Sequence, residues 1–412
     1  MVAALDHADR EGPARLYLKG LLLPGTRKSV EPMAARVSPE RVRSVHQSMH
    51  HLVAQASWSD AALLARVARV VLPKLVRAGE VVHWIIDDTG IPKQGKHSVG
   101  VAHQFCSRTG RQDNCQVAAS LSISTRRGSL PVGYRLYLPR EWSADGARRE
   151  HVGVPAGIAF ATKPVLALRE IRAALQAGYP HGTVLADVAC GDDARWREAV
   201  AGLGLRYAVG VSSGTTVWVG GQRPVPAPPG KPRGRSRRRA VRGRTHRSVA
   251  VATVARALPA RSWRTLTWRE GTAAPRSSRF ARIRVRAAPA DQPRAEAWLI
   301  IEWPAAASAP ARYWLSNLPR RMSWRALVDT VMGGWRIERD HRELKQELGF
   351  GQYEGRNWRG FHHHASLCIA VYGFLLLERL AGRKGTAAGL SAHAVPQGFR
   401  PRGAGAEAAP HA

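Results

Sequence analysis

The spacing of apolar residues in the first 79 positions predicts helices. Ser38-Pro39-Glu40 has the composition of a helix start, with a capping serine, a proline at the first helical position and an acid near the positive end of the dipole. A second helix is expected from about Ser59 to Leu75, because its apolar residues recur at intervals of three and four. The residues of this stripe are Leu63, Val67, Val70 and Val71. We predict a helical domain over residues 1–79.

From residue 80 the apolar pattern becomes that of β-strands. An apolar run over 81–86 ends in Asp87-Asp88-Thr89-Gly90, and a turn at 110–114 separates two further predicted strands. Helices then alternate with short apolar strands, the first of which ends in Asp187. The predicted strands cover 81–86, 99–106, 117–123, 183–186 and 207–211, and the predicted helices 164–177 and 193–203. The pattern is that of an α/β fold with a mixed central sheet over residues 80–211.

Residues 212–315 interrupt this alternation. The segment 223–230 is rich in proline, and 231–247 holds nine basic residues and no acid, with Arg237, Arg238 and Arg239 at its centre. Such a run is typical of a flexible loop that contacts phosphate. Strand alternation returns at 280–286 and 298–303. We predict a β-rich insertion that carries a basic, Pro/Arg-rich loop.

Helical periodicity resumes at Ser323, persists to about Leu348, and returns over 361–380, which defines a helical segment at 316–381. The tail 382–412 is rich in Ala, Gly and Pro and is predicted to be disordered. The apolar run at 365–377 is shorter than the ~20 residues that a membrane span needs, so we expect no membrane segment. The adjacent histidines 362–364 point in three directions on a helix, so we expect packing or phosphate contact from them and no metal site.

Composition narrows the class of protein. With 412 residues, 44% of them hydrophobic, the chain is long enough for two or three domains with real cores. Its 63 lysines and arginines against 30 acids give a net charge of +33, which indicates a polyanionic partner, most commonly nucleic acid. The four cysteines form no CxxC pair, which argues against a disulfide framework and favours the reducing cytoplasm.

Three acids are candidates for chemistry. Asp87 and Asp187 each follow an apolar strand, where a carboxylate is costly unless a partner such as a metal ion neutralises it. Each of them also has a plainer interpretation, as the cap of the following turn. Glu338 lies on a predicted helix with Arg342 and Lys345 one and two turns later on the same face. Spacing alone favours a surface salt bridge there; a metal ligand beside phosphate-binding cations is the alternative.

Carboxylates of this kind have a known use in phosphodiester chemistry. Two or three of them can hold two divalent ions roughly 4 Å apart for in-line attack by water or a 3′-hydroxyl. Hard oxygen ligands and a phosphate substrate favour Mg²⁺ or Mn²⁺. The sequence thus leaves open a two-metal site built from acids that lie far apart in the chain.

Five blocks, in order, resemble the DDE transposases of bacterial insertion sequences, in the branch with a β-rich insertion in an RNase H-like core. The resemblance covers about residues 15–380. The motifs of the five blocks are IIDDTGIPKQGKHS at 85–98, QDNCQV at 112–117, VLAD at 184–187, YWLSNL at 313–318, and WRIE at 335–338 through GRNWRGFHHH at 355–364. The resemblance implies an RNase H-like mixed sheet flanked by helices, interrupted by the insertion, with the catalytic core at 80–211 and 316–381.

The resemblance also assigns roles to residues. It implies that Asp87, Asp187 and Glu338 are the catalytic, metal-binding acids, with Asp88 an alternative to Asp87 and Glu343 a weaker competitor for Glu338. It implies that basic residues hold DNA, and the positions expected to do so are Lys345, Arg342, Lys93, Lys96, Arg237, Arg238 and Arg239. The N-terminal helices would bind the terminal inverted repeats of the element, and two copies would meet on double-stranded DNA.

The expected function is therefore that of a cytoplasmic, nucleoid-associated transposase that cuts DNA at the ends of its element and joins them to target DNA, with two Mg²⁺ or Mn²⁺ ions. The chain departs from the family pattern at Val331, Gly334 and 188–190, and the glycine pair 333–334 costs a helix about 1 kcal/mol per glycine. A catalytically decayed DNA-binding relative is therefore one alternative. An RNase H-like nuclease without strand transfer is another, and a basic nucleoid-type binder is the last.

Overall fold

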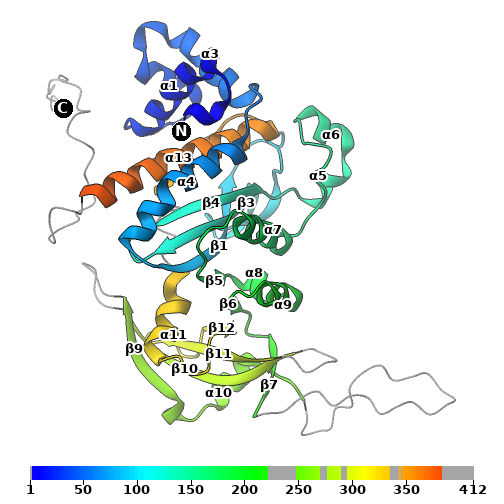
Figure 1. Cartoon of the computed structure of the whole chain (residues 1–412). Helices are drawn as coiled ribbons and strands as arrows, with labels where there is room; N and C mark the ends of the chain where they lie inside the picture. Colours follow the sequence, from blue (N-terminus) through cyan, green and yellow to red (C-terminus); the bar gives the residue numbers. More distant parts are fainter. Residues whose placement is uncertain are drawn as a thin grey trace, which may run out of the picture.

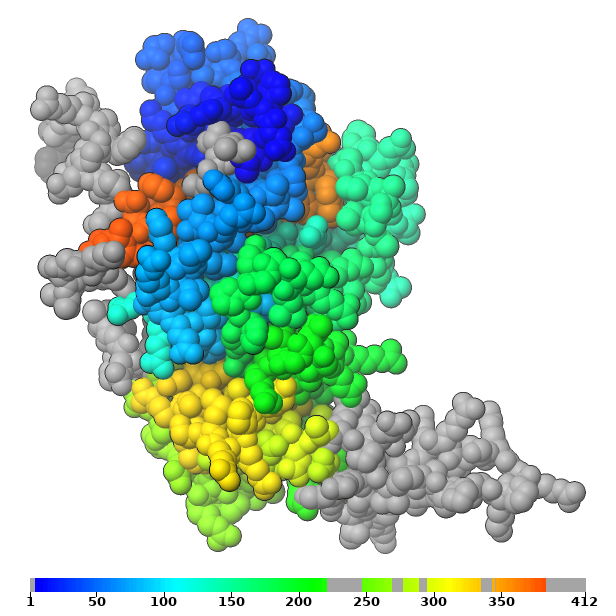
Figure 2. Space-filling model, viewed as in Figure 1, coloured from blue at the N-terminus to red at the C-terminus, as the bar shows by residue number. Residues whose placement is uncertain are grey.

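A computed structural model describes residues 2–220, 247–269, 276–288, 295–334, 343–344 and 346–382. Helices pack at one end of a long sheet and β-strands extend it at the other (Figure 1). The space-filling view shows the N-terminal helices at one end, the strands of residues 249–316 at the other and α7–α9 between them (Figure 2). Residues 221–246, which hold nearly all of the predicted basic loop, residues 383–412 of the tail that is predicted to be disordered, and the acid at position 338 lie outside the described residues.

The first 79 residues fold as helices, as predicted. Their elements are η1 (Val2–Leu5), η2 (Ala8–Arg10), α1 (Glu11–Leu22), α2 (Val30–Val37), η3 (Pro39–Arg41), α3 (Val42–Ala54) and α4 (Asp60–Ala78). The expected start at Ser38 forms a single 3-10 turn before α3. The Ser59 side chain caps α4 by accepting from the Ala62 N–H at 3.1 Å. The predicted stripe is buried except for Val70, which is exposed because it lies beside the packed face.

Twelve strands of the described residues form one sheet. Their bounds are β1 (Val81–Pro92), β2 (Ala102–Cys106), β3 (Arg111–Thr125), β4 (Ser129–Leu136), β5 (Thr183–Ala186), β6 (Tyr207–Val211), β7 (Thr216–Val219), β8 (Val249–Ala250), β9 (Trp263–Arg269), β10 (Arg276–Ala287), β11 (Glu296–Pro304) and β12 (Arg312–Ser316). The order is β2-β3-β1-β5-β6-β12-β11-β10-β7-β8, with β4 beside β3 and β9 beside β10. Because β3 and β1 are antiparallel whereas β1, β5 and β6 are parallel, the predicted mixed α/β sheet is confirmed.

Two strand predictions need correction. β1 continues through the two aspartates to Pro92, because β3 is long enough to pair with it as far as Cys115. The predicted turn at 110–114 is shorter: Gly110, with φ of 68°, ends it, and β3 begins at Arg111. Asp87 therefore lies inside a strand and not at its end.

The strands of the predicted insertion extend the sheet of the core. β12 pairs antiparallel with β6, and β11, β10 and β7 follow it in order. α10 (Val251–Ala257) covers one face of these strands with Val251, Val254 and Ala255. The core and the insertion therefore form one sheet, and each face of that sheet runs from the core into the insertion.

Helices cover both faces of the core strands. The bounds of the remaining elements are α5 (Arg140–Ala144), α6 (Gly146–His151), α7 (Lys163–Gln176), α8 (Val188–Gly191), α9 (Ala194–Gly202), η4 (Ala260–Ser262), α11 (Trp324–Val331), η5 (Met332–Gly334) and α13 (Trp358–Gly382). One core joins Trp84 and Ile86 of β1 to α4, α7 and α13, and a second joins Ile85 to α11 and η5 on the opposite face. Alternate residues of β1 thus face different layers.

The predicted helix from Ser323 to Leu348 is not continuous. The Ser323 side chain caps α11, as expected, by accepting from the Ala326 N–H at 3.1 Å. The α-helix ends at Val331, and the glycine pair continues as the 3-10 turn η5. Residues 335–342 lie outside the described part of the chain.

α13 comes late in the sequence but packs among the helices of the N-terminal domain. Its length and composition alone would allow it to cross a membrane. Most of its residues as far as Gly373 are buried, however, and it packs against α1, α3, α4 and β4. The three adjacent histidines lie within it and are 5% exposed or less. A helix surrounded by protein in this way is a core helix.

Candidate active site

The pairing of β1 with β5 places two of the predicted acids at the same level of the sheet. The parallel register joins Ile85 to Leu185. Asp87 lies two residues further on within β1, and Asp187 lies level with it, one residue beyond the last residue of β5. Side chains of a strand alternate between faces, so Asp87 lies on the face of Ile85, which belongs to one core with α11. Asp87 therefore projects from β1 on the face that α11 covers, and Asp187 follows the end of the adjacent strand.

Asp187 is both a helix cap and a member of an acidic group. Its side chain accepts from the N–H groups of Ala189 at 3.1 Å and Cys190 at 3.4 Å, which caps α8. The interpretation of Asp187 as the cap of the following turn is therefore confirmed. Burial, followed by the charges of Asp88 and Asp87, nevertheless raises the pKa of Asp187 above its ordinary value. Asp187 thus lies close enough to Asp88 and Asp87 for their charges to disfavour its ionised form.

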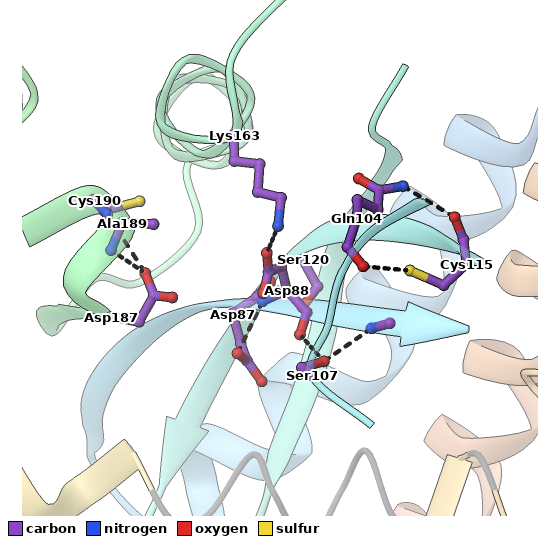
Figure 3. Close-up of polar contacts among 11 residues, drawn as sticks. Asp87, Asp88, Gln104, Ser107, Cys115, Ser120, Lys163, Asp187, Ala189 and Cys190 are labelled. Carbon is purple, nitrogen blue, oxygen red and sulfur yellow. Dashed lines mark hydrogen bonds and ion pairs between the residues drawn. The ribbon is translucent and has the colours of Figure 1, made fainter. Parts of the chain in front are cut away.

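Asp87 and Asp88 point to opposite sides of β1 (Figure 3). The Asp88 N–H donates to Asp87 Oδ1 at 2.8 Å, while the Asp88 carboxylate forms an ion pair with Lys163 at the start of α7. Asp88 contributes more than Asp87 to the raised pKa of Asp187, but it already has this cation. The geometry therefore separates two residues that the sequence left equivalent.

Lys163, Ser107 and Ser120 were missed by the sequence analysis. Ser120 Oγ donates to the Asp87 carbonyl and Ser107 Oγ to the Asp88 carbonyl, both at 3.2 Å, and these bonds fix the strand that carries the acids. A signal for Lys163 was present, because a lysine in the first turn of a helix opposes the helix dipole. Only the fold shows which acid it meets.

The third predicted acid, Glu338, and the cations Arg342 and Lys345 lie outside the described residues. The chain just before them is described. A side chain at Gly333 would have its Cβ 2.4 Å from His83 Cε1, so η5 lies directly against β1. His83 and Asp87 share a face of that strand by alternation. The competitor Glu343 forms an ion pair with Arg379 at 2.8 Å.

The predicted DNA-binding lysines near β1 differ in exposure. Lys93 is half-buried and donates to the Tyr353 carbonyl at 2.6 Å, and burial lowers its pKa to about 8. Lys96 is exposed, and its carbonyl accepts from Arg148 at 2.8 Å. The predicted Arg237, Arg238 and Arg239 lie outside the described residues.

A group of arginines and tryptophans on β9, β10, β11 and the start of α11 was not predicted. The guanidinium groups of Arg264 and Arg282 lie 5.1 and 4.6 Å from the ring centre of Trp324, and those of Arg282 and Arg284 lie 4.9 and 4.8 Å from Trp298. We call these five residues the arginine–tryptophan surface. Trp298 shares a core with Ile85 and Leu185, so the surface lies on the sheet face that carries Asp87.

Comparison with known families gives this geometry a context. A family model described as DDE superfamily endonuclease matches residues 1–275. The chain belongs to this family. The matched residues include Asp87, Asp88, Asp187 and Lys163. Endonucleases of this superfamily generally depend on divalent metal ions.

A relative with a more specific description matches part of the chain. The probable transposase for insertion sequence element IS701 from Microchaete diplosiphon is 28% identical over 168 residues. The match covers 40% of this chain and 41% of that transposase, which is less than half of either protein.

The acids of this DDE endonuclease fit a divalent cation by their chemistry. Carboxylate oxygens are the ligands that hard divalent ions prefer. Burial, and after it the charges of Asp88 and Asp87, raise the pKa of Asp187, and a bound cation would offset both effects. Within the described residues no three His, Cys, Asp or Glu side chains lie close enough to hold a metal ion. The α13 histidines are occupied elsewhere, for example His363, whose ring nitrogens contact the Val53 and Trp58 carbonyls at 3.0 and 2.9 Å.

Proposed function

We propose that this DDE endonuclease is an insertion-sequence transposase that cuts DNA at the ends of its element and joins the cut ends to target DNA. The observation that carries the proposal is the level placement of Asp87 in β1 and Asp187 just after the adjacent parallel strand β5. Family membership and the IS701 relative support the reaction class. The proposed setting is the bacterial cytoplasm, with two copies of the chain on DNA.

Asp87, Asp187 and Glu338 are the proposed catalytic and metal-binding acids. η5 supports this set, because it brings the chain to His83 on the Asp87 face five residues before position 338. These acids would hold two Mg²⁺ or Mn²⁺ ions, whose chemistry would be to activate water or a 3′-hydroxyl and to stabilise the leaving oxygen. The protein's part is to hold the carboxylates and the DNA backbone in place, so no covalent protein–DNA intermediate is expected.

Charge supports double-stranded DNA as the substrate. The net charge of +33 needs a polyanion, and the arginine–tryptophan surface lies on the face of the proposed acids. We propose that this surface and the basic residues Lys96, Arg342 and Lys345 hold phosphates near the cut. The terminal inverted repeats are assigned to the N-terminal helices by the same proposal.

The test uses the full chain, Mn²⁺ or Mg²⁺, and a duplex that carries the inverted repeats flanking the gene. We expect cleavage at the repeat ends, reduced about a thousandfold or more by Asp187→Asn or Glu338→Gln, because each removes a charged metal ligand. Glu343→Gln is the matched control, since this glutamate is paired with Arg379 and should leave cleavage within about threefold of wild type.

The same assay separates the alternatives. Joined products with a target plasmid support a transposase, whereas cleavage without joining would indicate an RNase H-like nuclease. Tight binding of the repeats with no cleavage in either metal would indicate a catalytically decayed DNA-binding relative. Binding with no preference for the repeats would leave only a basic nucleoid-type binder.

A further inference from the structure

Lys163 lies within the acidic group but at an unfavourable position for its own helix. It is the first residue of α7, where a positive charge opposes the helix dipole, so the stability of α7 does not explain it. Its ammonium is paired with the Asp88 carboxylate, and the two side chains are only 26% and 20% exposed. The centre of the Tyr137 ring lies 5.9 Å from Lys163 Nζ. The lysine is thus held in place by the fold.

The ion pair determines where the Asp88 carboxylate lies. In Figure 3 Lys163 meets Asp88 from the α7 side of β1, while Asp87 points the other way. Without the lysine, Asp88 would be an uncompensated carboxylate beside Asp187.

We propose that Lys163 is a positioning residue that keeps Asp88 out of the metal-binding set and so leaves Asp87 and Asp187 to bind the cation. The inference rests on the proposed function, because it assumes a divalent ion at these acids. It adds that the choice between two adjacent aspartates is made by a lysine on another element. Lys163 acts through Asp88 and does not touch the reacting atoms.

A double-mutant cycle tests this role, with the variants Lys163→Met, Asp88→Asn and the combination of both. Two quantities are measured on the full chain: Mn²⁺ affinity by calorimetry without DNA, and cleavage at saturating Mn²⁺. Lys163→Met frees Asp88, so Mn²⁺ should bind about threefold more tightly or better while cleavage falls about tenfold or more. Because affinity and rate move in opposite directions, simple loss of structure does not mimic this result.

The double variant Lys163→Met/Asp88→Asn shows whether Lys163 acts through Asp88. If Lys163 acts only through Asp88, Lys163→Met/Asp88→Asn should match Asp88→Asn in both quantities, within about twofold. Lys163→Arg, which keeps the cation, should stay close to wild type. Asp88→Asn should weaken Mn²⁺ binding far less than Asp87→Asn does. A thermal melt of each variant confirms that it is folded.

Two results would overturn the proposal. If the combined variant remains as slow as Lys163→Met, the lysine acts on another group, such as a DNA phosphate. If Asp88→Asn abolishes Mn²⁺ binding, Asp88 is itself a ligand. The affinity measurements need no turnover, so they decide the role of Lys163 even if the wild-type protein cuts no DNA.

Discussion

Asp187 combines a stabilising hydrogen-bond arrangement with a destabilising charge. Its two backbone donors cap α8, but burial and the neighbouring carboxylates raise its pKa. A carboxylic acid with a raised pKa in the folded state stabilises the protein below its unfolded pKa, and this contribution is lost as the pH rises through the folded value. The electrostatic cost in the metal-free protein therefore grows as the pH rises.

Asp187→Asn should raise the thermal midpoint of the metal-free protein at pH 7.5, because asparagine keeps the cap and removes the charge. We expect a gain on the order of 2 °C for each kcal/mol relieved, and a smaller gain as the pH falls toward 4. Scanning calorimetry without divalent ions measures it. Asp187→Ala is the control, since it loses about 1 kcal/mol of capping as well. An Asn variant less stable than wild type at pH 7.5 would contradict the argument.

At the scale of residues, the sequence indicated candidate acids but not how their side chains are placed. Asp87 and Asp187 were predicted from the strands before them, and the register brings them level. Asp87 and Asp88 could not be separated, because their assignment depends on which layer each face of β1 meets. Lys163 could not be matched to Asp88, since no local pattern connects residues 75 positions apart. The assignment of the catalytic acids remains a prediction.

Among the elements, η5 shows how a glycine pair that weakens a helix can serve packing. The pair was expected to cost helix stability, and α11 does end just before it. Gly333 then lies against the His83 ring with no room for a Cβ, whereas a Cβ at Gly334 would meet nothing within 4 Å. The close approach brings the segment before position 338 onto the face of Asp87.

Gly333→Ala should therefore destabilise the protein by about 1–3 kcal/mol, because the new methyl group overpacks against His83. Gly334→Ala is a matched control that adds the same methyl group in open space and should change stability by less than about 1 kcal/mol. Urea unfolding gives both values. If the two variants were equally stable, η5 would not be packed as described. Cleavage should fall with Gly333→Ala alone.

The buried histidines of α13 should make the stability of its packing depend on pH. Burial lowers the pKa of His364 to about 4, and its ring contacts Tyr17 Oη at 2.7 Å and the Gly349 carbonyl at 3.0 Å. A histidine with a lowered folded pKa contributes stability that is present above its unfolded value of 6.5 and is lost as the pH falls toward 4. His364 links α1 to the core through α13, so acid should weaken this packing.

We expect the free energy of unfolding of the wild type to fall between pH 6.5 and 4, by up to about 3 kcal/mol from His364. His364→Asn cannot titrate, so its unfolding free energy should fall less over this interval, even though the variant is less stable at pH 7. Denaturant titrations at half-unit pH steps measure the slope. Parallel slopes for the two proteins would mean that His364 is not neutral in the fold.

Elements with a strong local signal were predicted well, and those set by distant contacts were not. α4, α7, α9, β5 and β6 lie within a few residues of their predicted bounds, because periodicity and caps define them. β1 was predicted too short, since its second half is held by pairing with β3. The helix after Ser323 was predicted too long, because the contact of Gly333 with His83 is not visible in a local pattern.

At the scale of the whole molecule, the sheet shared by the core and the insertion determines which face carries the arginine–tryptophan surface. The arginine–tryptophan surface faces the same side as Asp87, whereas α9 covers the other side through Trp196 and Val200. A duplex bound at the acids could therefore reach the surface without turning around the sheet. The net charge alone would not predict this, because it says nothing about which face is basic.

DNA binding should be strongly salt-dependent, with affinity falling by roughly 10³–10⁵ between 50 and 200 mM salt if six to ten phosphates are contacted. Replacing Arg264 and the nearby exposed Arg320 by glutamine should reduce the slope of log K against log salt by about one to two. Arg195 is an exposed residue of α9, and Arg195→Gln is the control that should leave the slope unchanged. Fluorescence anisotropy over this salt range gives the slopes. Equal slopes for all proteins would place the phosphate contacts elsewhere.

The position of α13 has a consequence for biosynthesis. α1, α3 and α4 complete their core with a helix that begins about 280 residues after α4 ends. At ribosomal rates of about 5–20 residues per second, the nascent N-terminal helices wait roughly 15–55 s for that partner. During this interval their apolar faces are open to chaperones and to aggregation, so the yield of folded protein should depend on translation speed and on holdase capacity.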